Sequence, residues 1–203
     1  MPDQSYRTFL KNLEQQGELL HFTKEVDPAD NMSAIEWKAY NELGKASLFS
    51  NLKGHEGWQA TSQILADRRK WAIGLGVSED EILDEMSERL KQAVKTVDVD
   101  SSAAPVQEVV FEGDDVNILD VPAMMTSEKD GGRYFASGMA IVKDPETGIR
   151  NMSVHRQMIL NERETGFIMV PRQAKRIYDM YAAEGKGMPV AMVYGAHPAI
   201  FYG

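Results

Sequence analysis

The feature that most constrains this chain is a pair of long apolar segments on either side of one tight turn. The segments cover 134–143 and 151–160, and the turn between them is Asp144-Pro145-Glu146-Thr147-Gly148. This pattern predicts a β-hairpin, in which alternate side chains share a face. One face is expected to carry Asn151, Ser153 and His155, and the other Met152, Val154 and Arg156. A strand that turns an amide, a hydroxyl and an imidazole to one side is either solvated there or lines a site.

The composition excludes several classes of protein. A chain of 203 residues that is 43% hydrophobic can bury a core, as one large domain or two small ones. The absence of cysteine excludes disulfides, thiolate nucleophiles and zinc–thiolate sites. The polar N-terminus lacks a signal core and no run approaches transmembrane length, so we expect a cytoplasmic protein with no membrane partner. A net charge of -9 argues against a nucleic-acid partner.

The charge is unevenly distributed along the chain. Residues 1–131 hold 13 Lys and Arg against 25 Asp and Glu, whereas residues 132–203 hold 9 against 6. A basic segment joined to an acidic one suits an anionic ligand, such as a phosphate or a carboxylate, in the second part. The alternative interpretation is that the acidic part only keeps the protein soluble.

Residues 1–104 alternate between helix and strand signals and predict a small α/β domain. Helices are expected over 6–16, from Asn31 or Ser33 to Leu43, over 67–74, and from a capping box at 78–81 to about Val94. Strands are expected at 18–23 and 46–52.

Beyond a polar linker at 98–105 the signals change, and 105–203 forms a second predicted domain. Strand-like segments at 106–111, 134–143, 151–160 and 166–170 predict an antiparallel sheet or a β-barrel. A helix over 173–183 and a buried strand over 189–194 are expected to follow.

The order of several motifs resembles the UbiD family of decarboxylases. These motifs are Gly132-Arg133-Tyr134-Phe135, the turn 144–148, Asn151-Met152-Ser153-Val154-His155-Arg156, Val170-Pro171-Arg172-Gln173 and the stretch 188–199. The resemblance implies an α/β (α+β) chain with an N-terminal α/β domain and part of a split-barrel flavin-binding domain. It also implies decarboxylation of aromatic or α,β-unsaturated acids with prenylated FMN.

The resemblance also assigns roles to individual residues. Asn151 matches a ligand of the Mn²⁺ or Mg²⁺ that bridges to the cofactor phosphate, and K⁺ is a further candidate ion. Ser153 and Val154 match cofactor-binding positions. Arg156 matches a catalytic arginine beside the flavin, which can hold a substrate carboxylate through two hydrogen bonds. Strict alternation separates Arg156 from Asn151, so these roles require a bulge or a strand end between them.

Simpler interpretations of the same residues remain open. Asn151 lies near the hairpin turn and could serve turn geometry alone. Arg156 could form a surface ion pair with Glu162 or Glu164. His155 is expected only as a neighbour of the site, since a single strand histidine is commonly a packing residue.

The chain departs from the family pattern after Pro171. The family places a metal-binding histidine where this chain has Gln173, preceded by Arg172. Glutamine is a weaker, neutral ligand for Mn²⁺, although it remains a candidate for metal and cofactor binding. Arg172 could instead contact the cofactor phosphate directly.

The second departure is that the chain stops where the family's sequence runs on. The expected function is therefore that of the N-terminal part of a decarboxylase acting on a small hydroxylated aromatic acid. We expect it to be inactive alone, to need the missing C-terminal portion or a partner subunit, and to act within a homo-oligomer. The alternative is a non-catalytic subunit or assembly module that kept the fold without the cofactor.

Overall fold

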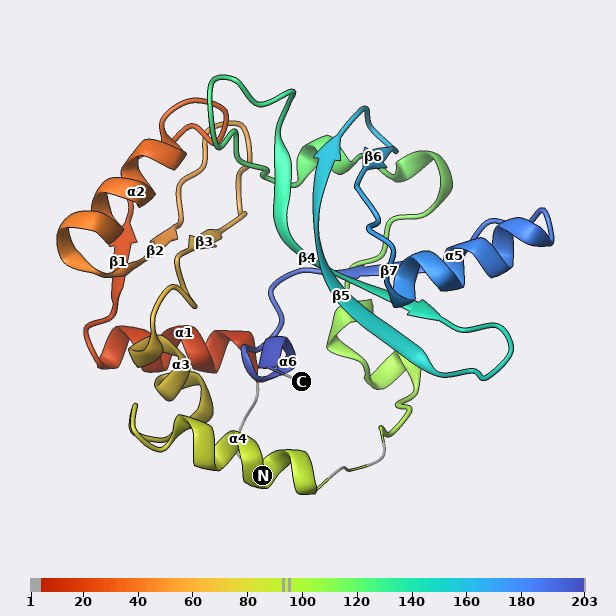
Figure 1. Cartoon of the computed structure of the whole chain (residues 1–203). Helices are drawn as coiled ribbons and strands as arrows, with labels where there is room; N and C mark the ends of the chain where they lie inside the picture. The colour runs from red at the N-terminus through yellow and green to blue at the C-terminus, as the bar shows by residue number, and fades with distance from the viewer. Residues whose placement is uncertain (1–4, 93, 95, 203) are drawn as a thin grey trace.

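A computed structural model of the chain describes residues 5–92, 94 and 96–202 and contains two separate β-sheets (Figure 1). The first part of the chain forms α1 (Tyr6–Gln15), β1 (Leu19–Phe22), α2 (Met32–Leu43), β2 (Ala46–Phe49), β3 (Ala60–Ser62), α3 (Arg68–Leu75) and α4 (Ile82–Lys91). The second forms β4 (Tyr134–Lys143), β5 (Arg150–Ile159), β6 (Thr165–Gly166), α5 (Gln173–Ala183), β7 (Val190–Val193) and α6 (Ala199–Tyr202). Four short 3₁₀ turns occupy 101–103, 105–107, 113–115 and 118–120.

The first sheet has the strand order β1-β2-β3, with β1 and β2 parallel and β2 and β3 antiparallel. Its helices pack on the sheet through fully buried side chains, among them Phe9 and Leu13 of α1 and Phe49 of β2. Local chemistry sets the helix ends. The Asp67 side chain accepts a hydrogen bond from the Lys70 N–H at the start of α3, and Gly44 ends α2 at φ +66°.

The second sheet has the order β6-β5-β4-β7 and is antiparallel throughout. The predicted hairpin is confirmed, with Val142 paired to Asn151 next to the turn. Gly148 closes that turn at φ +71°, a conformation that costs glycine little because it has no Cβ. Helix α5 packs on the sheet through Ala174 and Ile177, which form a buried cluster with Val142.

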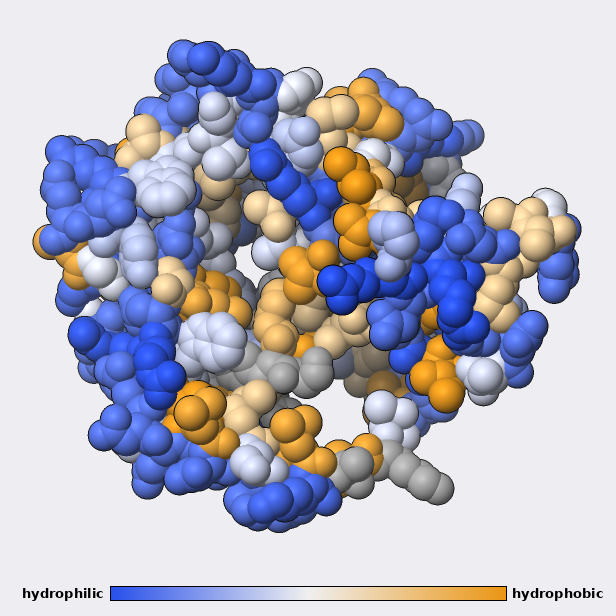
Figure 2. Space-filling model, viewed as in Figure 1, coloured by the Kyte–Doolittle hydropathy of each residue, from blue (hydrophilic) through white to orange (hydrophobic). Residues whose placement is uncertain are grey.

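Specific contacts attach the first part of the chain to the segment that precedes β4. Ser33 Oγ donates to the carbonyl of Thr126 at 2.8 Å, and His55 Nδ1 lies 2.9 Å from the carbonyl of Asp120. After β7 the chain returns to the first part, where α6 lies beside α1 (Figure 1) and buried His197 packs edge-on against Phe9 at 5.8 Å. Figure 2 nevertheless shows an open gap between the second sheet and the N-terminal part of the chain.

Several predicted elements are wrong. The segment 106–111 is not a strand, and three of its apolar side chains, Val106, Val109 and Phe111, are more than 65% exposed. The strand predicted over 166–170 is limited to β6, because only Thr165 and Gly166 find partners on β5. The last strand is an edge strand rather than a buried one, with Val190 38% exposed.

The predicted helix ends are partly wrong. Helix α4 ends at Lys91 rather than near Val94. Its predicted capping box is only half formed, because Glu81 accepts from the Ser78 N–H and hydroxyl while the helix begins at Ile82. Asn31 stands at the N-cap of α2 but gives the helix no side-chain hydrogen bond. Among the described residues, no helix has the length and apolar character needed to cross a membrane.

Candidate cofactor and substrate site

The two faces of β5 differ as the alternation predicted. Asn151, Ser153 and His155 are half-buried, whereas Met152, Val154 and Arg156 are exposed. Directly paired residues share a face, so the pairing of Asn151 with Val142 turns the polar set towards the side on which α5 packs. The polar face of β5 and the N-terminus of α5 therefore meet.

A pocket of about 260 Å³ lies where they meet. It is lined by Asn151, Met152, Ser153, Val154, His155, Met169, Val170, Arg172, Gln173 and Ala174. Only Met158 and Ile159 of β5 pair with β6, so the edge of β5 beside this pocket carries no neighbouring strand within the described chain. The structure thus brings together five of the six predicted site residues and leaves out Arg156. The pocket is slightly smaller than the roughly 300–1,000 Å³ typical of sites that enclose a whole organic ligand.

Asn151 is the least satisfied polar group in this pocket. Its Oδ1 is buried and has no hydrogen-bond partner, a condition shared among the described residues only with Ser47 Oγ in the first sheet. An unsatisfied buried oxygen is destabilising, and it fits the position of a ligand for a hard cation. Within the described ranges no group of three His, Cys, Asp or Glu could hold a metal. The residues present therefore fit only one part of a metal site, with Asn151 as a ligand and Gln173 as a second neutral amide.

The N-terminus of α5 fits an anion. Arg172 occupies the N-cap position, and no side chain caps the first turn of the helix. Uncapped backbone N–H groups and the helix dipole favour a negatively charged group such as a phosphate. The side chains of Arg172 and Gln173 form no hydrogen bond with any described residue, so both are available to a ligand.

Ser153 and His155 form a connected pair on the polar face. Ser153 Oγ lies 2.9 Å from His155 Nε2, and the imidazole packs against Phe167 with ring centroids 5.0 Å apart. His155 is thus held by packing and by one hydrogen bond, as expected of a neighbour of the site. Its position orients the Ser153 hydroxyl at the pocket wall.

A buried aspartate attaches α5 to the hairpin. Asp144 accepts hydrogen bonds from the backbone N–H groups of Thr147 and Glu146, each at 3.0 Å, and forms an ion pair with Arg176 of α5. The Thr147 N–H, with help from Glu146 and Arg176, holds the pKa of the Asp144 carboxyl below its ordinary value. This contact was not predicted from the sequence, in which Asp144 is only a turn residue. It fixes the start of α5 relative to Asn151.

Close packing behind the sheet depends on one glycine. Gly138 pairs with His155, and a Cβ there would lie 2.8 Å from both Met192 Cε and Tyr194 Cε1. The Tyr194 hydroxyl donates to Gln157 Oε1, and burial raises the pKa of Tyr194 to about 12. Gly138 therefore allows the segment around β7 to pack against the strands that carry the pocket.

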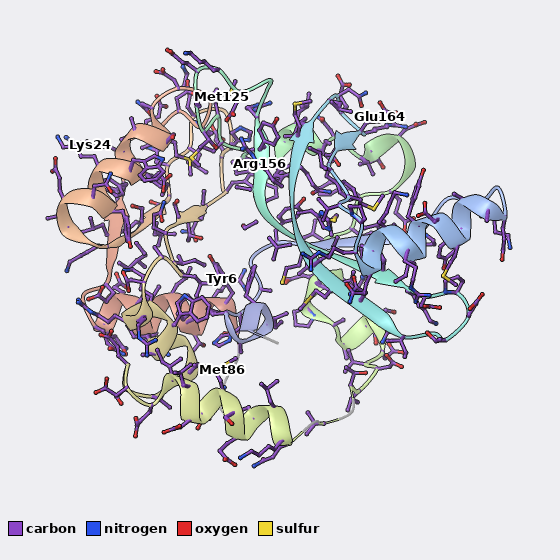
Figure 3. The ribbon with its side chains drawn as sticks, in the orientation of Figure 1. Tyr6, Lys24, Met86, Met125, Arg156 and Glu164 are labelled. Carbon is purple, nitrogen blue, oxygen red and sulfur yellow. The ribbon has the colours of Figure 1, made fainter. Side chains whose placement is uncertain are left out.

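Arg156 lies on the opposite face of β5 from Asn151. Its guanidinium Cζ is 3.9 Å from the centre of the Tyr134 ring, and its Nη2 donates to Asp130 at 2.9 Å. The alternative ion pair with Glu162 or Glu164 is not formed, because Arg156 pairs with Asp130 instead, and Figure 3 shows Glu164 well apart from Arg156. The bulge expected within β5 is also wrong, because the extra residue lies on β4. Ala136 and Ser137 there stand opposite Arg156 alone, between the paired positions 135 and 138.

The chain as a whole matches two sequence profiles of one family. The profile described as the 3-octaprenyl-4-hydroxybenzoate carboxy-lyase N-terminal domain matches residues 10–90. The profile described as the Rift-related domain of the same carboxy-lyase, UbiD, matches residues 97–203.

Individual relatives agree with these profiles. Ferulic acid decarboxylase 1 of Saccharomyces cerevisiae is 30% identical over 98% of this chain and 43% of its own length. Anhydromevalonate phosphate decarboxylase of Methanosarcina mazei is 29% identical over 98% of this chain and 44% of its own length. The chain thus spans less than half the length of these curated relatives.

Solved structures agree at the level of the fold. An evolved dimeric form of the UbiD-class enzyme HmfF from Pelotomaculum thermopropionicum, in complex with prFMN, superposes with a TM-score of 0.90. It is 26% identical, and the match covers 98% of this chain and 46% of that one. The predicted fold class, a small α/β domain followed by part of a split β-barrel, is confirmed.

Proposed function

Because this chain belongs to the UbiD family, we propose that it forms the N-terminal part of a prenylated-FMN-dependent decarboxylase of an aromatic, hydroxylated carboxylic acid. The observation that carries this proposal is the buried Asn151 Oδ1 without a partner, in a pocket at the uncapped N-terminus of α5. An orphaned acceptor beside an anion site is explained by a ligand that brings both a cation and a phosphate.

We assign the pocket to the phosphate end of the cofactor. Asn151 and Gln173 would offer amide oxygens to a divalent cation, Mn²⁺ or Mg²⁺, and Arg172 with the first turn of α5 would hold the phosphate. Ser153 would contribute its hydroxyl. Val154 and Val170 are 55% and 57% exposed at the pocket, so they offer apolar surface to a flavin ring. Prenylated FMN, when bound, supplies the electron-accepting centre of the reaction.

Arg156 would hold the substrate carboxylate. Its side chain is 47% exposed and its guanidinium stacks on Tyr134, so about half of the side chain is open to a carboxylate. It lies on the opposite face of β5 from the phosphate pocket, which separates the substrate end from the phosphate end across one strand. A flavin that reached both would have to pass the edge of β5.

The remaining groups belong to the proposal for the whole enzyme. Decarboxylation needs an acid that protonates the product carbon, and none of the described residues that line the pocket carries a carboxyl group. We propose that sequence present in the full-length relatives, in the same chain or in a partner subunit, supplies this acid and covers the pocket. We also propose the division at residues 104 and 105, and a homo-oligomeric enzyme.

Cofactor binding tests the proposal. FMN and prenylated FMN would be titrated into the 203-residue protein with and without Mn²⁺, followed by absorbance and metal analysis. We expect metal-dependent binding that is lost in Asn151→Ala and kept in Ser47→Ala, which alters the other orphaned oxygen far from the pocket. Cofactor affinity that changes neither when Mn²⁺ is omitted nor in Asn151→Ala would contradict the assignment.

A further inference from the structure

The loop 127–133 places a carboxylate against Arg156. Asp130 Oδ2 accepts from Arg156 Nη2 at 2.9 Å, and the Asp130 side chain is only 20% exposed. The Tyr134 ring lies against the face of the same guanidinium, 3.9 Å from its Cζ. The guanidinium is therefore held at one edge by a charge and on one face by a ring. Figure 3 shows Arg156 on the side of the sheet where Met125, just before this loop, also lies.

Asp130 is itself held in place. Its Oδ2 accepts a hydrogen bond from the Ser127 backbone N–H at 3.1 Å, and its own N–H donates to the Ser127 carbonyl at 3.0 Å. The next residue is Gly131, where an added Cβ would lie 3.3 Å from Met158 Sδ. Met158 is two residues along β5 from Arg156 and so shares its face. Glycine lets the loop lie close over this face, which brings the carboxylate to the guanidinium.

The other donors of Arg156 are free. Nε and Nη1 form no hydrogen bond with any residue that the structure describes. Because the guanidinium is planar and its five N–H groups form a fixed fork, fixing one edge and one face also fixes the direction of the free N–H groups. We propose that Asp130 is a positioning residue, which aims the free N–H groups of Arg156 at the substrate carboxylate. This inference rests on the proposed role of Arg156.

Two opposite effects of Asp130 can be separated by substitution. Holding a flexible side chain before binding is worth about three- to tenfold in affinity, because the ordering entropy is not lost again on binding. The negative charge of Asp130 acts the other way and weakens the attraction for a second anion. Asp130→Ala removes both effects, whereas Asp130→Asn keeps an acceptor oxygen and removes only the charge.

The test uses NMR of the 203-residue protein with benzoate as the probe. The ¹⁵Nε order parameter of Arg156 and the benzoate affinity would be measured in wild type, Asp130→Ala and Asp130→Asn. Asp114→Ala is the matched control, because fully exposed Asp114 pairs at 2.8 Å with Arg163, an arginine about as exposed as Arg156. We expect Asp130→Ala to lower the order parameter and to bind benzoate about three- to tenfold more weakly than Asp130→Asn, which carries the same charge. Asp130→Asn should keep the order parameter near that of wild type and bind benzoate at least as tightly as wild type, and the control should change neither.

The outcomes distinguish the two proposals. An unchanged Arg156 order parameter in Asp130→Ala, or benzoate binding as tight in Asp130→Ala as in Asp130→Asn, overturns the positioning role. Benzoate binding that is absent in wild type, or unaffected by Arg156→Gln, overturns the substrate role of Arg156. The order parameter is measured without a ligand, so it shows whether Asp130 orders the Arg156 guanidinium even if benzoate does not bind. Far-UV circular dichroism would confirm that each variant folds.

Discussion

Replacing Asn151 with leucine should make the protein more stable and unable to bind its cofactor. Asn151 Oδ1 is buried without a partner, so the folded chain has lost the water bound to that oxygen and gained nothing in return. Such a loss costs about 1–3 kcal/mol, and leucine has the same branching without polar atoms. We expect Asn151→Leu to raise the free energy of unfolding by about 1–2 kcal/mol, because only the oxygen of this half-buried side chain is buried.

The magnitude is large enough to measure. For a chain of this size, each kcal/mol shifts the Tm by about 2–4 °C, so the variant should melt about 2–8 °C higher than wild type. Thermal unfolding by near-UV circular dichroism would be paired with Mn²⁺-dependent FMN binding on the same samples. Ser47→Ala should gain similar stability without losing binding, because Ser47 Oγ is equally orphaned but lies in the first sheet. An Asn151→Leu variant that melts below wild type while binding normally would refute the reasoning.

Three further predictions concern the framework of the site. Gly138→Ala should lower the free energy of unfolding by about 1–3 kcal/mol, because its Cβ would meet two side chains at 2.8 Å, whereas Gly187→Ala, in open space, should not; denaturant melts would show it. Lys70→Met should cost about 1–3 kcal/mol, because it removes the fully buried ammonium that pairs with Glu18 and Asp67, against under about 1 kcal/mol for Lys91→Met on the surface; equal losses would contradict this. Since the pKa of Asp144 is lowered in the fold, its charge stabilises the protein above pH 3.8 and this support is lost as the pH falls further; Asp144→Asn should flatten that acid limb of a stability-against-pH curve.

The hairpin was predictable because its information is local. The turn 144–148 and the alternation in 151–156 each depend on neighbours in the chain, and the structure has them as expected. The failed strands were predicted from apolar composition alone. The segment 106–111 has that composition but finds no strand to pair with, and strand formation depends on such pairing.

The candidate site divides in the same way. Alternation correctly predicted that Asn151 and Arg156 lie on opposite faces of β5. The family resemblance then required an irregularity in β5, whereas the structure has its bulge on β4. The contact of Asp130 with Arg156 spans 26 residues, and that of Asp144 with Arg176 spans 32. Neither could be read from spacing, although the glycines after Asp130 were a visible sign of close backbone packing.

The sequence by itself determined the family, the hairpin, the position of helix α5 and the set of polar groups along β5, because periodicity, turn residues and motif order are properties of neighbouring residues. Only the tertiary structure decided that Asn151 is buried without a partner, that the start of α5 opens onto it, and that Arg156 is held by Asp130 and Tyr134 on the other face. Burial and long-range pairing depend on how separate elements pack in three dimensions, and no local pattern records that.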